Sequence, residues 1–428
     1  MRKNLSIAVL LLSLILVISA GTVLAKEKVV LKAVVTQEAE PFFQDLARQL
    51  DANHPEVDIE VQLEAIPYGD IRMKLLTMAA AGNAPDVALI DHIWMGEFWR
   101  GGFLMDITDK VSKEDKEDFF PNIWDGFVRF DDRAYGVPIS TDTREVYYYK
   151  PYWQDAGIDS VPSTWTELLE VTQKLNAPPH HYGLGIWMHS PTAFYVGLWQ
   201  GGGEVVTEKN GKAEVGYASP AGQAALQLIV DAHNKYKVAP TSFDGELDTT
   251  FLQGKYACYL WGMGSNYYDI ARGMGWSVED FTEKIGVSEN PLPDGVYDSG
   301  NTQQATMIGG WAATVFKDTD YPELALEFIL SATSQENAIE YSRKSNTLPV
   351  RRSAYTTENI QLMKGWMPYV ELYVKELEYA QVRPSRPEYP QLHRFLTDAM
   401  QAAVLQPKTP VKQHLDAAAK KGNGVLGK

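Results

Sequence analysis

The sequence predicts an α/β protein made of two wound domains, and three observations lead to this prediction. Strand and helix patterns alternate from residue 29 to residue 91 in the order strand, helix, strand, helix, strand, which is typical of a wound α/β domain. The chain has 428 residues, more than one hydrophobic core usually serves. No flexible linker separates two halves, so we expect crossover strands to join the domains.

The first expected elements lie between residues 29 and 91. Residues 29–35 alternate as a buried strand, and the helix that follows places four apolar side chains at helical spacing. Residues 57–63 predict a second strand, residues 71–81 a helix that Gly82 ends, and residues 86–91 a third strand. The four apolar side chains of the first helix are Phe42, Phe43, Leu46 and Leu50.

Helix start signals and apolar runs mark the later elements. Thr164 and Glu167 form a capping box that starts a helix at Trp165, and Ser219 followed by Pro220 starts another. The remaining expected elements are strands at 256–261 and 307–316, and helices at 322–334, at 358–377 and from Pro390 onward.

Residues 1–25 have the pattern of a secretory signal. The basic residues Arg2 and Lys3 precede an apolar run over residues 7–18, and small residues up to Ala25 complete the pattern. The run is short for a membrane span, and no later segment approaches the roughly 20 apolar residues that a span needs. We expect cleavage after Ala25, a soluble exported protein and, in an organism with two membranes, a periplasmic location.

The charge and the single cysteine exclude several partners. The formal net charge is −16, and it becomes −18 when residues 1–25, which carry two basic residues and no acid, are removed. This acidity argues against nucleic acid or an anionic membrane as a partner. Cys258 lies far from the cleavage site, so no cysteine is available there for a lipid anchor, and no intramolecular disulfide can form.

Motifs of the common enzyme classes are absent. The sequence has no G-x-S-x-G, no G-x-x-x-x-G-K-[ST], no H-E-x-x-H and no cysteine pair for a metal. His180 and His181 are adjacent, and adjacent residues of an extended chain point to opposite faces, so a surface loop is favoured over a metal site. We expect no metal and no cofactor. Paired carboxylates could still serve a glycosidase, although neighbouring acids are expected by chance in so acidic a chain.

Six segments, in a fixed order, carry a resemblance to one protein family. They are GNAPDVALID, YGVPISTDTREVYYYKPYWQDAGI, VPSTWTELLEVTQKL, GGWAATV, NTLPVRRSAY and RPEYPQLHRFLTDAMQAAVL. Over nearly the whole mature chain the sequence resembles the extracellular solute-binding proteins of family 1, the ligand-capturing subunits of ATP-driven sugar importers. The chain departs from the family's usual pattern at Glu145 and Tyr149, where a small residue and an Asn or Asp are common.

The resemblance implies a two-lobed periplasmic binding protein fold of type II that closes on its ligand by hinge motion. We expect residues 26–140 and 303–346 to form the N-terminal lobe, and residues 141–302 and 347–428 to form the C-terminal lobe. The implied partners are a carbohydrate ligand, from a monosaccharide to an oligosaccharide, and the permease subunits of an ABC transporter in the membrane. We expect a monomer.

A sugar ligand needs aromatic side chains for its flat C–H faces and charged groups for its hydroxyls. Asp91 ends a strand, where ligands bind in open α/β sheets, and Trp94 follows one turn later. Sugar binders that resemble this chain carry an acid at Asp91, and a helix N-cap is the alternative role. Glu38 is also expected in the cleft, although Glu38 and Glu40 could each be a first-turn helix acid instead.

Tryptophans at strand ends and a glycine pair supply further candidates. Trp261 ends a strand before Gly262, which favours a stacking role over a core position. Gly309 and Gly310 lie inside an expected strand, where glycine often marks the close approach of a ligand or backbone. The family uses this place to bring backbone amides and an aromatic residue, here Trp311, to the ligand. A bulge with Trp311 in the core is the alternative.

The segment from 138 to 150 is expected to leave the first lobe and to enter a strand of the second. Strand alternation puts Asp142 and Arg144 on one side, so we predict that they pair at the hinge and face the cleft. Trp187 and Arg386 complete the expected site, although Arg383 also precedes a proline and the sequence does not choose between the two arginines. Tyr68 is a weaker candidate, for which a solvated position is favoured.

The predicted function is the capture of a carbohydrate for delivery to an ABC transporter, without catalysis. One alternative is the same fold binding a polyol, a sugar acid or a sugar or glycerol phosphate, as Arg144 and Arg351 suggest. A second alternative is a secreted glycoside-active enzyme that uses two of Asp91, Asp142 and Glu145.

Overall fold

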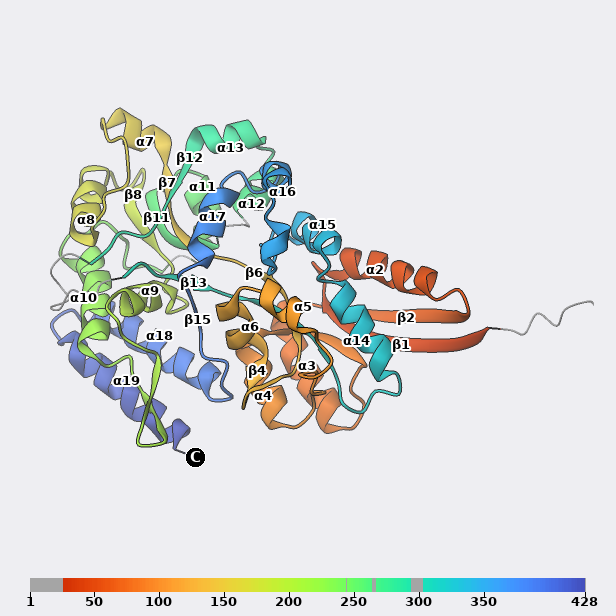
Figure 1. The fold of residues 1–428 in the computed structure, drawn as a ribbon. Helices are drawn as coiled ribbons and strands as arrows, with labels where there is room; N and C mark the ends of the chain where they lie inside the picture. The colour runs from red at the N-terminus through yellow and green to blue at the C-terminus, as the bar shows by residue number, and fades with distance from the viewer. Residues whose placement is uncertain (1–25, 244, 264–266, 294–302, 428) are drawn as a thin grey trace, which may run out of the picture.

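The computed structural model describes residues 26–243, 245–263, 267–293 and 303–427 (Figure 1). Two sheets with helices packed around them confirm the predicted α/β class. In the first sheet β1 runs parallel to β2 and β3, whereas β14 runs antiparallel to β3 and β6. Its strands, in order, are β2 (Val57–Ile66), β1 (Glu27–Thr36), β3 (Val87–Asp91), β14 (Gly310–Val315) and β6 (Val137–Thr141).

The first sheet is built as its sequence pattern predicts. All five residues of β3 are buried, because the strand is central and helices cover the sheet. Helix α2 (Glu40–Asn53) buries the four apolar residues that the helical spacing singled out. Phe42 packs edge to face on Tyr341 of α15 (Gln335–Ser345), with 4.9 Å between the ring centroids. Helix α3 (Tyr68–Ala80) begins three residues earlier than expected.

The second sheet has four strands. Strand β7 pairs antiparallel with β11 and β12, and β11 runs parallel to β8. The order is β12 (Ile285–Ser288), β7 (Arg144–Tyr149), β11 (Tyr256–Met263) and β8 (Tyr182–Ile186). The predicted helix starts are confirmed: Thr164 caps α8 (Trp165–Lys174) by accepting from the amide of Glu167, and Ser219 caps α10 (Pro220–Asn234).

Two crossovers of the chain lie side by side at the first sheet (Figure 1). The first runs from β6 into β7 across Asp142 and Thr143, and the second runs from β13 (Thr306–Ile308) into β14 across Gly309. The single strand expected at 307–316 is therefore wrong. It is broken at Gly309, because β13 pairs in parallel with β15 (Ala380–Val382) while β14 joins the first sheet. The residue boundaries of the two lobes stay a prediction.

The expected helix at 358–377 is also wrong as a single element. It is two helices, and Pro368, whose ring is incompatible with a helix interior, lies between them.

No helix in the described part of the chain is long and apolar enough to cross a membrane. The predicted signal at 1–25 lies outside the described residues. The remaining elements are α4 (His92–Arg100), α5 (Lys113–Asp118), α6 (Pro121–Val128), β4 (Arg129–Phe130), β5 (Arg133–Ala134), α7 (Lys150–Asp155), α9 (Thr192–Gln200), β9 (Val206–Lys209), β10 (Lys212–Val215), α11 (Leu247–Leu252), α12 (Tyr267–Gly273), α13 (Val278–Lys284), α14 (Pro322–Ser331), a 3-10 turn (Arg352–Ala354), α16 (Thr357–Met363), α17 (Val370–Leu377), α18 (Tyr389–Leu405) and α19 (Val411–Leu426).

A pair of buried carboxyl groups lies beneath the first crossover. Glu145 on β7 and Glu376 on α17 have no solvent exposure and interact with each other. Among the described residues, Oε1 of Glu145 and both carboxyl oxygens of Glu376 are buried without a hydrogen bond of good geometry, and a proton on the pair would supply a donor. Burial raises the pKa of Glu145 to about 7, and burial together with the charge of Glu145 raises the pKa of Glu376 well above its usual range.

This pair should make the protein more stable at acidic than at alkaline pH. A carboxyl group whose pKa is raised by folding contributes stability below its unfolded pKa and loses it as pH rises through the folded value. We expect Glu376→Gln to match the wild type at about pH 5 and to exceed its free energy of unfolding by about 1–3 kcal/mol at about pH 8.5. Urea denaturation across this range measures the difference. The exposed Glu378→Gln is the control, and the same pH dependence in both variants would contradict the prediction.

Candidate functional site

A cleft of about 760 Å³ is lined by elements of both sheets and by the two crossovers. This volume lies within the range of small-molecule sites in proteins. Because the crossovers form part of its lining, a ligand in the cleft contacts the parts of the chain that a hinge motion would change. The structure brings nine predicted site residues to this one cleft: Glu38, Asp91, Trp94, Asp142, Arg144, Trp187, Gly309, Gly310 and Trp311.

Asp91 lies at the end of β3 and is only 6 % exposed. Its Oδ1 accepts from the amide of Ile93, which makes it the N-cap of α4, and its Oδ2 accepts from the Tyr68 hydroxyl at 3.0 Å. The two roles that the sequence left open, N-cap and cleft residue, therefore coexist. Burial alone raises the pKa of the Asp91 carboxyl, but the hydrogen bond from His92 and the charge of Arg383 hold it below its usual range.

Three aromatic side chains form one wall of the cleft. The rings of Trp94 and Trp311 meet edge to face with centroids 5.9 Å apart, and Tyr68 meets Trp311 in the same way at 5.8 Å. Trp311 is partly exposed, although a bulge does separate it from Ala312 in the pairing with β6. Tyr68 is 51 % exposed, yet it lines the cleft. The sequence favoured a solvated position for this side chain and did not predict its place in this wall.

The glycine pair is required by close packing at the second crossover. A Cβ atom on Gly310 would lie 2.0 Å from the carbonyl oxygen of Ser140, and the φ angle of Gly310 is +155°. A Cβ atom on Gly309 would lie 2.8 Å from Nη2 of Arg383 and 3.3 Å from Oδ1 of Asp142. The glycines thus permit both a close backbone approach and the convergence of charged side chains at the cleft.

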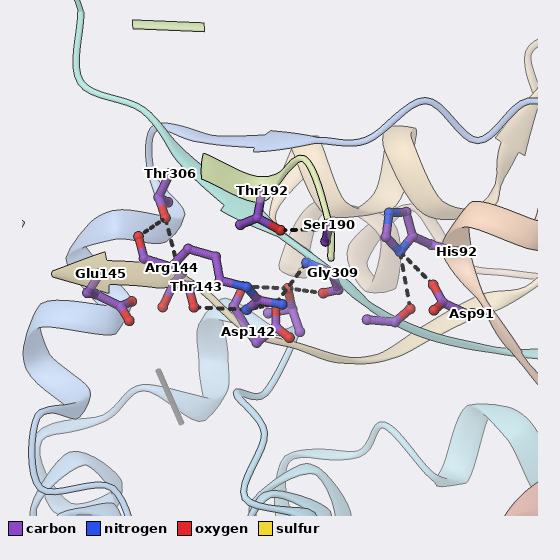
Figure 2. Close-up of polar contacts among 12 residues, drawn as sticks. Asp91, His92, Asp142, Thr143, Arg144, Glu145, Ser190, Thr192, Thr306 and Gly309 are labelled. Atoms are coloured by element: carbon purple, nitrogen blue, oxygen red, sulfur yellow. Dashed lines mark hydrogen bonds and ion pairs between the residues drawn. The ribbon is translucent and has the colours of Figure 1, made fainter. Parts of the chain in front are cut away.

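The predicted pair of Asp142 and Arg144 is confirmed (Figure 2). Nη1 of Arg144 lies 2.7 Å from Oδ1 of Asp142, and the same carboxylate oxygen accepts from the amide of Gly309 at 2.8 Å. The Thr306 hydroxyl accepts from the backbone amide of Arg144 and donates to its carbonyl. These bonds connect the first crossover with the second.

The comparison with known families decides what kind of protein this is. A family model described as bacterial extracellular solute-binding protein matches residues 35–339. The chain belongs to this family. The family resemblance expected from the six sequence segments is confirmed.

Curated relatives of this solute-binding protein cover most of its length. A putative binding protein of Brucella abortus is 23 % identical and spans 89 % of both chains. The maltodextrin-binding protein MdxE of Bacillus subtilis is 26 % identical over 76 % of this chain and 72 % of its own. The sn-glycerol-3-phosphate-binding periplasmic protein UgpB of Yersinia enterocolitica is 24 % identical over 68 % of this chain and 66 % of its own.

Solved structures confirm the two-lobed fold of type II that the resemblance implied. The cyclic α-maltosyl-1,6-maltose binding protein of Arthrobacter globiformis matches with a TM-score of 0.79 and 24 % identity, over 93 % of this chain and 99 % of its own. The sugar-binding protein MalE of Xanthomonas citri also matches with a TM-score of 0.79, at 20 % identity, over 93 % of this chain and 98 % of its own.

The structure separates the alternatives that the sequence of this solute-binding protein left open. Arg383 lines the cleft and Arg386 does not, so the placement of Arg386 in the site is corrected. The guanidinium of Arg386 instead faces Glu208 at 3.9 Å and Glu388 at 3.7 Å. In the same way Glu38 lines the cleft, whereas Glu40 is the first residue of α2.

Other expected site residues have different outcomes. Half-buried Trp187 lines the cleft, whereas the side chain of Trp261 lies outside the described part of the chain and its stacking role stays a prediction. His181 packs flat on Tyr152 with centroids 3.9 Å apart. No group of three or more potential metal ligands occurs among the residues that the structure describes.

Sequence reasoning missed several cleft residues. Tyr389 and His393 occupy successive turns of α18, and Asp248 accepts a hydrogen bond from the Tyr259 hydroxyl at 2.9 Å. The spacing of Tyr389 and His393 by four residues was a usable signal, because such residues share one face of a helix. No local pattern marks Asp248, whose place depends on how α11 packs on β11.

Gly310→Ala should destabilise the binding protein strongly. The added methyl group meets the Ser140 carbonyl, and the positive φ angle is unfavourable for alanine, so we expect a loss of about 3 kcal/mol or more. Gly424→Ala is the matched control, because its Cβ atom would meet nothing within 4 Å on α19. That control should change the stability by about 1 kcal/mol or less. Equal midpoints of thermal unfolding for the two variants would contradict the packing argument.

Proposed function

We propose that this solute-binding protein captures a carbohydrate in the cleft and delivers it to the permease of an ATP-driven importer. The observation that carries the proposal is the wall formed by Tyr68, Trp94 and Trp311, with the carboxylates of Asp91 and Asp142 in the same cleft. Aromatic faces stack on the C–H faces of a sugar, and carboxylates accept strong hydrogen bonds from its hydroxyls. MdxE, which is named for maltodextrin binding, supports this class of ligand.

Closure of the lobes on the ligand is the proposed mechanism. The cleft lining comes from both sheets, so a ligand makes all its contacts only when the lobes are together, and binding shifts the population toward that closed form. Asp142 lies on the first crossover, pairs there with Arg144 and accepts a hydrogen bond from Gly309 on the second crossover. It therefore lies where the proposed ligand and the proposed hinge meet. The closed form is the one that we expect the permease subunits to recognise, with the protein exported and acting as a monomer.

The charges of the cleft favour a neutral sugar over a phosphate ester. Four carboxylates line the cleft, and they outnumber the two guanidinium groups, of which Arg144 is already paired with Asp142. The other guanidinium, Arg383, is the group that could bind an anion, and UgpB is named for a phosphate ester. A sugar or glycerol phosphate is therefore the second candidate ligand. The four carboxylates are those of Glu38, Asp91, Asp142 and Asp248.

The carboxylates of the cleft are engaged in ways that suit binding rather than hydrolysis. Asp91 already accepts two hydrogen bonds, and Asp142 accepts one from the Gly309 amide and pairs with Arg144. The pKa of the Asp91 carboxyl is held below its usual range, which makes it a poor proton donor. Glu145, the third candidate acid, is buried and does not line the cleft. We propose no catalytic role for these groups.

A ligand panel tests the proposed ligand class. We expect neutral mono- to trisaccharides to raise the midpoint of thermal unfolding, because a ligand that binds only the folded protein stabilises it. sn-Glycerol 3-phosphate, a sugar acid and a polyol should give smaller shifts. A larger shift with the phosphate ester would select the second candidate, and release of shorter sugars on incubation with oligosaccharides would show an enzyme instead.

Trp311→Ala should weaken sugar binding without unfolding the protein. Loss of a stacking surface should lower the affinity at least about tenfold, because one aromatic contact contributes about 1.4 kcal/mol or more. Isothermal titration calorimetry with the best sugar of the panel measures the change. Trp276→Ala is the control, since Trp276 is partly buried but lies outside the cleft lining, beside Lys284. Equal affinities for the two variants would remove Trp311 from the site.

A further inference from the structure

His92 lies directly behind the aspartate of the cleft. The residue follows Asp91 at the start of α4, has no solvent exposure, and stacks on Phe127 with ring centroids 4.4 Å apart and an angle of 18° between the planes. Its Nδ1 is 3.1 Å from Oδ1 of Asp91 and 3.3 Å from the carbonyl oxygen of Gly310 (Figure 2). One ring atom therefore contacts both the cleft carboxylate and the second crossover.

The contacts of the imidazole fix its tautomer. Both neighbours of Nδ1 are acceptors, so Nδ1 carries the hydrogen and donates to them. Nε2 is buried and has no hydrogen-bond partner among the described residues, so a proton there would be an unsatisfied buried donor. Burial, with a further contribution from the charge of Arg383, lowers the pKa of His92. The ring is therefore neutral, with hydrogen on Nδ1 and a free lone pair on Nε2.

The backbone of His92 is held as firmly as its ring. The Ser385 hydroxyl donates to the carbonyl oxygen of His92, and the carbonyl oxygen of Ser385 leaves no room for a side chain at Gly96, one turn further along α4. The start of α4 therefore packs against the segment that carries Arg383 into the cleft. The imidazole cannot turn away without breaking the stack on Phe127 and both bonds of Nδ1.

We propose that His92 is a positioning residue, whose Nδ1–H holds Oδ1 of Asp91 and the Gly310 carbonyl together, so that Oδ2 of Asp91 stays directed at the cleft. The groups bonded to Asp91 divide between its two oxygens: His92 and the Ile93 amide hold Oδ1, and the Tyr68 hydroxyl bonds Oδ2. The charge of Arg383 also acts on this carboxylate, and it is unchanged in every His92 variant. His92 also ties the end of β3 to the crossover between β13 and β14, which a hinge motion would strain. The role in ligand binding rests on the proposed function, whereas the bond to Asp91 does not.

Three substitutions separate this role from simple core filling. His92→Asn can place an amide N–H where Nδ1 lies, His92→Gln places its amide nearer the position of Nε2, and His92→Phe keeps only the ring. We expect the pKa of Asp91, followed by carboxyl-carbon NMR in the ligand-free protein, to stay low in His92→Asn and to rise in His92→Gln and His92→Phe. Equal values in all three variants and the wild type would overturn the proposal.

A measurement on the wild type keeps the test decisive when a variant fails to fold. In protein labelled with ¹⁵N-histidine, the His92 ring should show a protonated Nδ1 and an unprotonated Nε2 from about pH 6 to about pH 8. A protonated Nε2 would overturn the proposal. Both NMR readouts are made without ligand, so a failure of sugar binding leaves them interpretable.

The consequence for binding is measured separately with maltotriose as the probe. We expect His92→Gln to lose about tenfold in affinity and His92→Asn to lose little, because only the former removes the bond that orients Asp91. Equal affinity of His92→Gln and the wild type would overturn the role in binding. Absence of binding to the wild type would count against the carbohydrate ligand, while the NMR result would still decide whether His92 holds Asp91.

Discussion

The bond between the Asp142 carboxylate and the amide of Gly309 is the interaction on which the architecture of the cleft depends. Asp142 lies on the crossover from β6 to β7, and Gly309 on the crossover from β13 to β14, so a single carboxylate oxygen joins the two crossovers. Arg144 supplies the neutralising charge at 2.7 Å. Asp142 therefore joins the crossovers structurally, and its carboxylate oxygens are also placed to accept hydrogen bonds from ligand hydroxyls.

Crowding around this junction explains the residue types beside it. Gly310 passes so close to the Ser140 carbonyl that no side chain fits, and the bulge that follows turns Trp311 into the cleft. The carbonyl of Gly310 is then free to accept from His92, which also holds Asp91. Asp91 thus contacts the start of β14 through His92, and the aromatic wall contacts it through Trp311. A ligand that binds these groups therefore acts on the crossover that leads into β14.

The second lobe carries a different kind of constraint. Glu145 is the next residue after Arg144, yet strand alternation turns it away from the cleft and into the core, where it meets Glu376. Burial raises the pKa of both carboxyl groups, so the folded protein loses stability as pH rises and the pair loses its protons. The acidic and basic residues that crowd this stretch of sequence therefore belong to two environments, a junction at the cleft and a buried carboxyl pair in the core.

The sequence by itself determined the features that depend on near neighbours. Strand and helix order up to Asp91, the caps at Thr164 and Ser219, and the pairing of Asp142 with Arg144 follow from periodicity and short-range geometry. Only the tertiary structure decided the split of the 307–316 strand, the choice of Arg383 over Arg386, the place of Tyr68 in the aromatic wall and the partner of Glu145. Each of these features depends on contacts between segments far apart in the chain. Local sequence patterns do not report such contacts, because they reflect only residues near one another in the sequence.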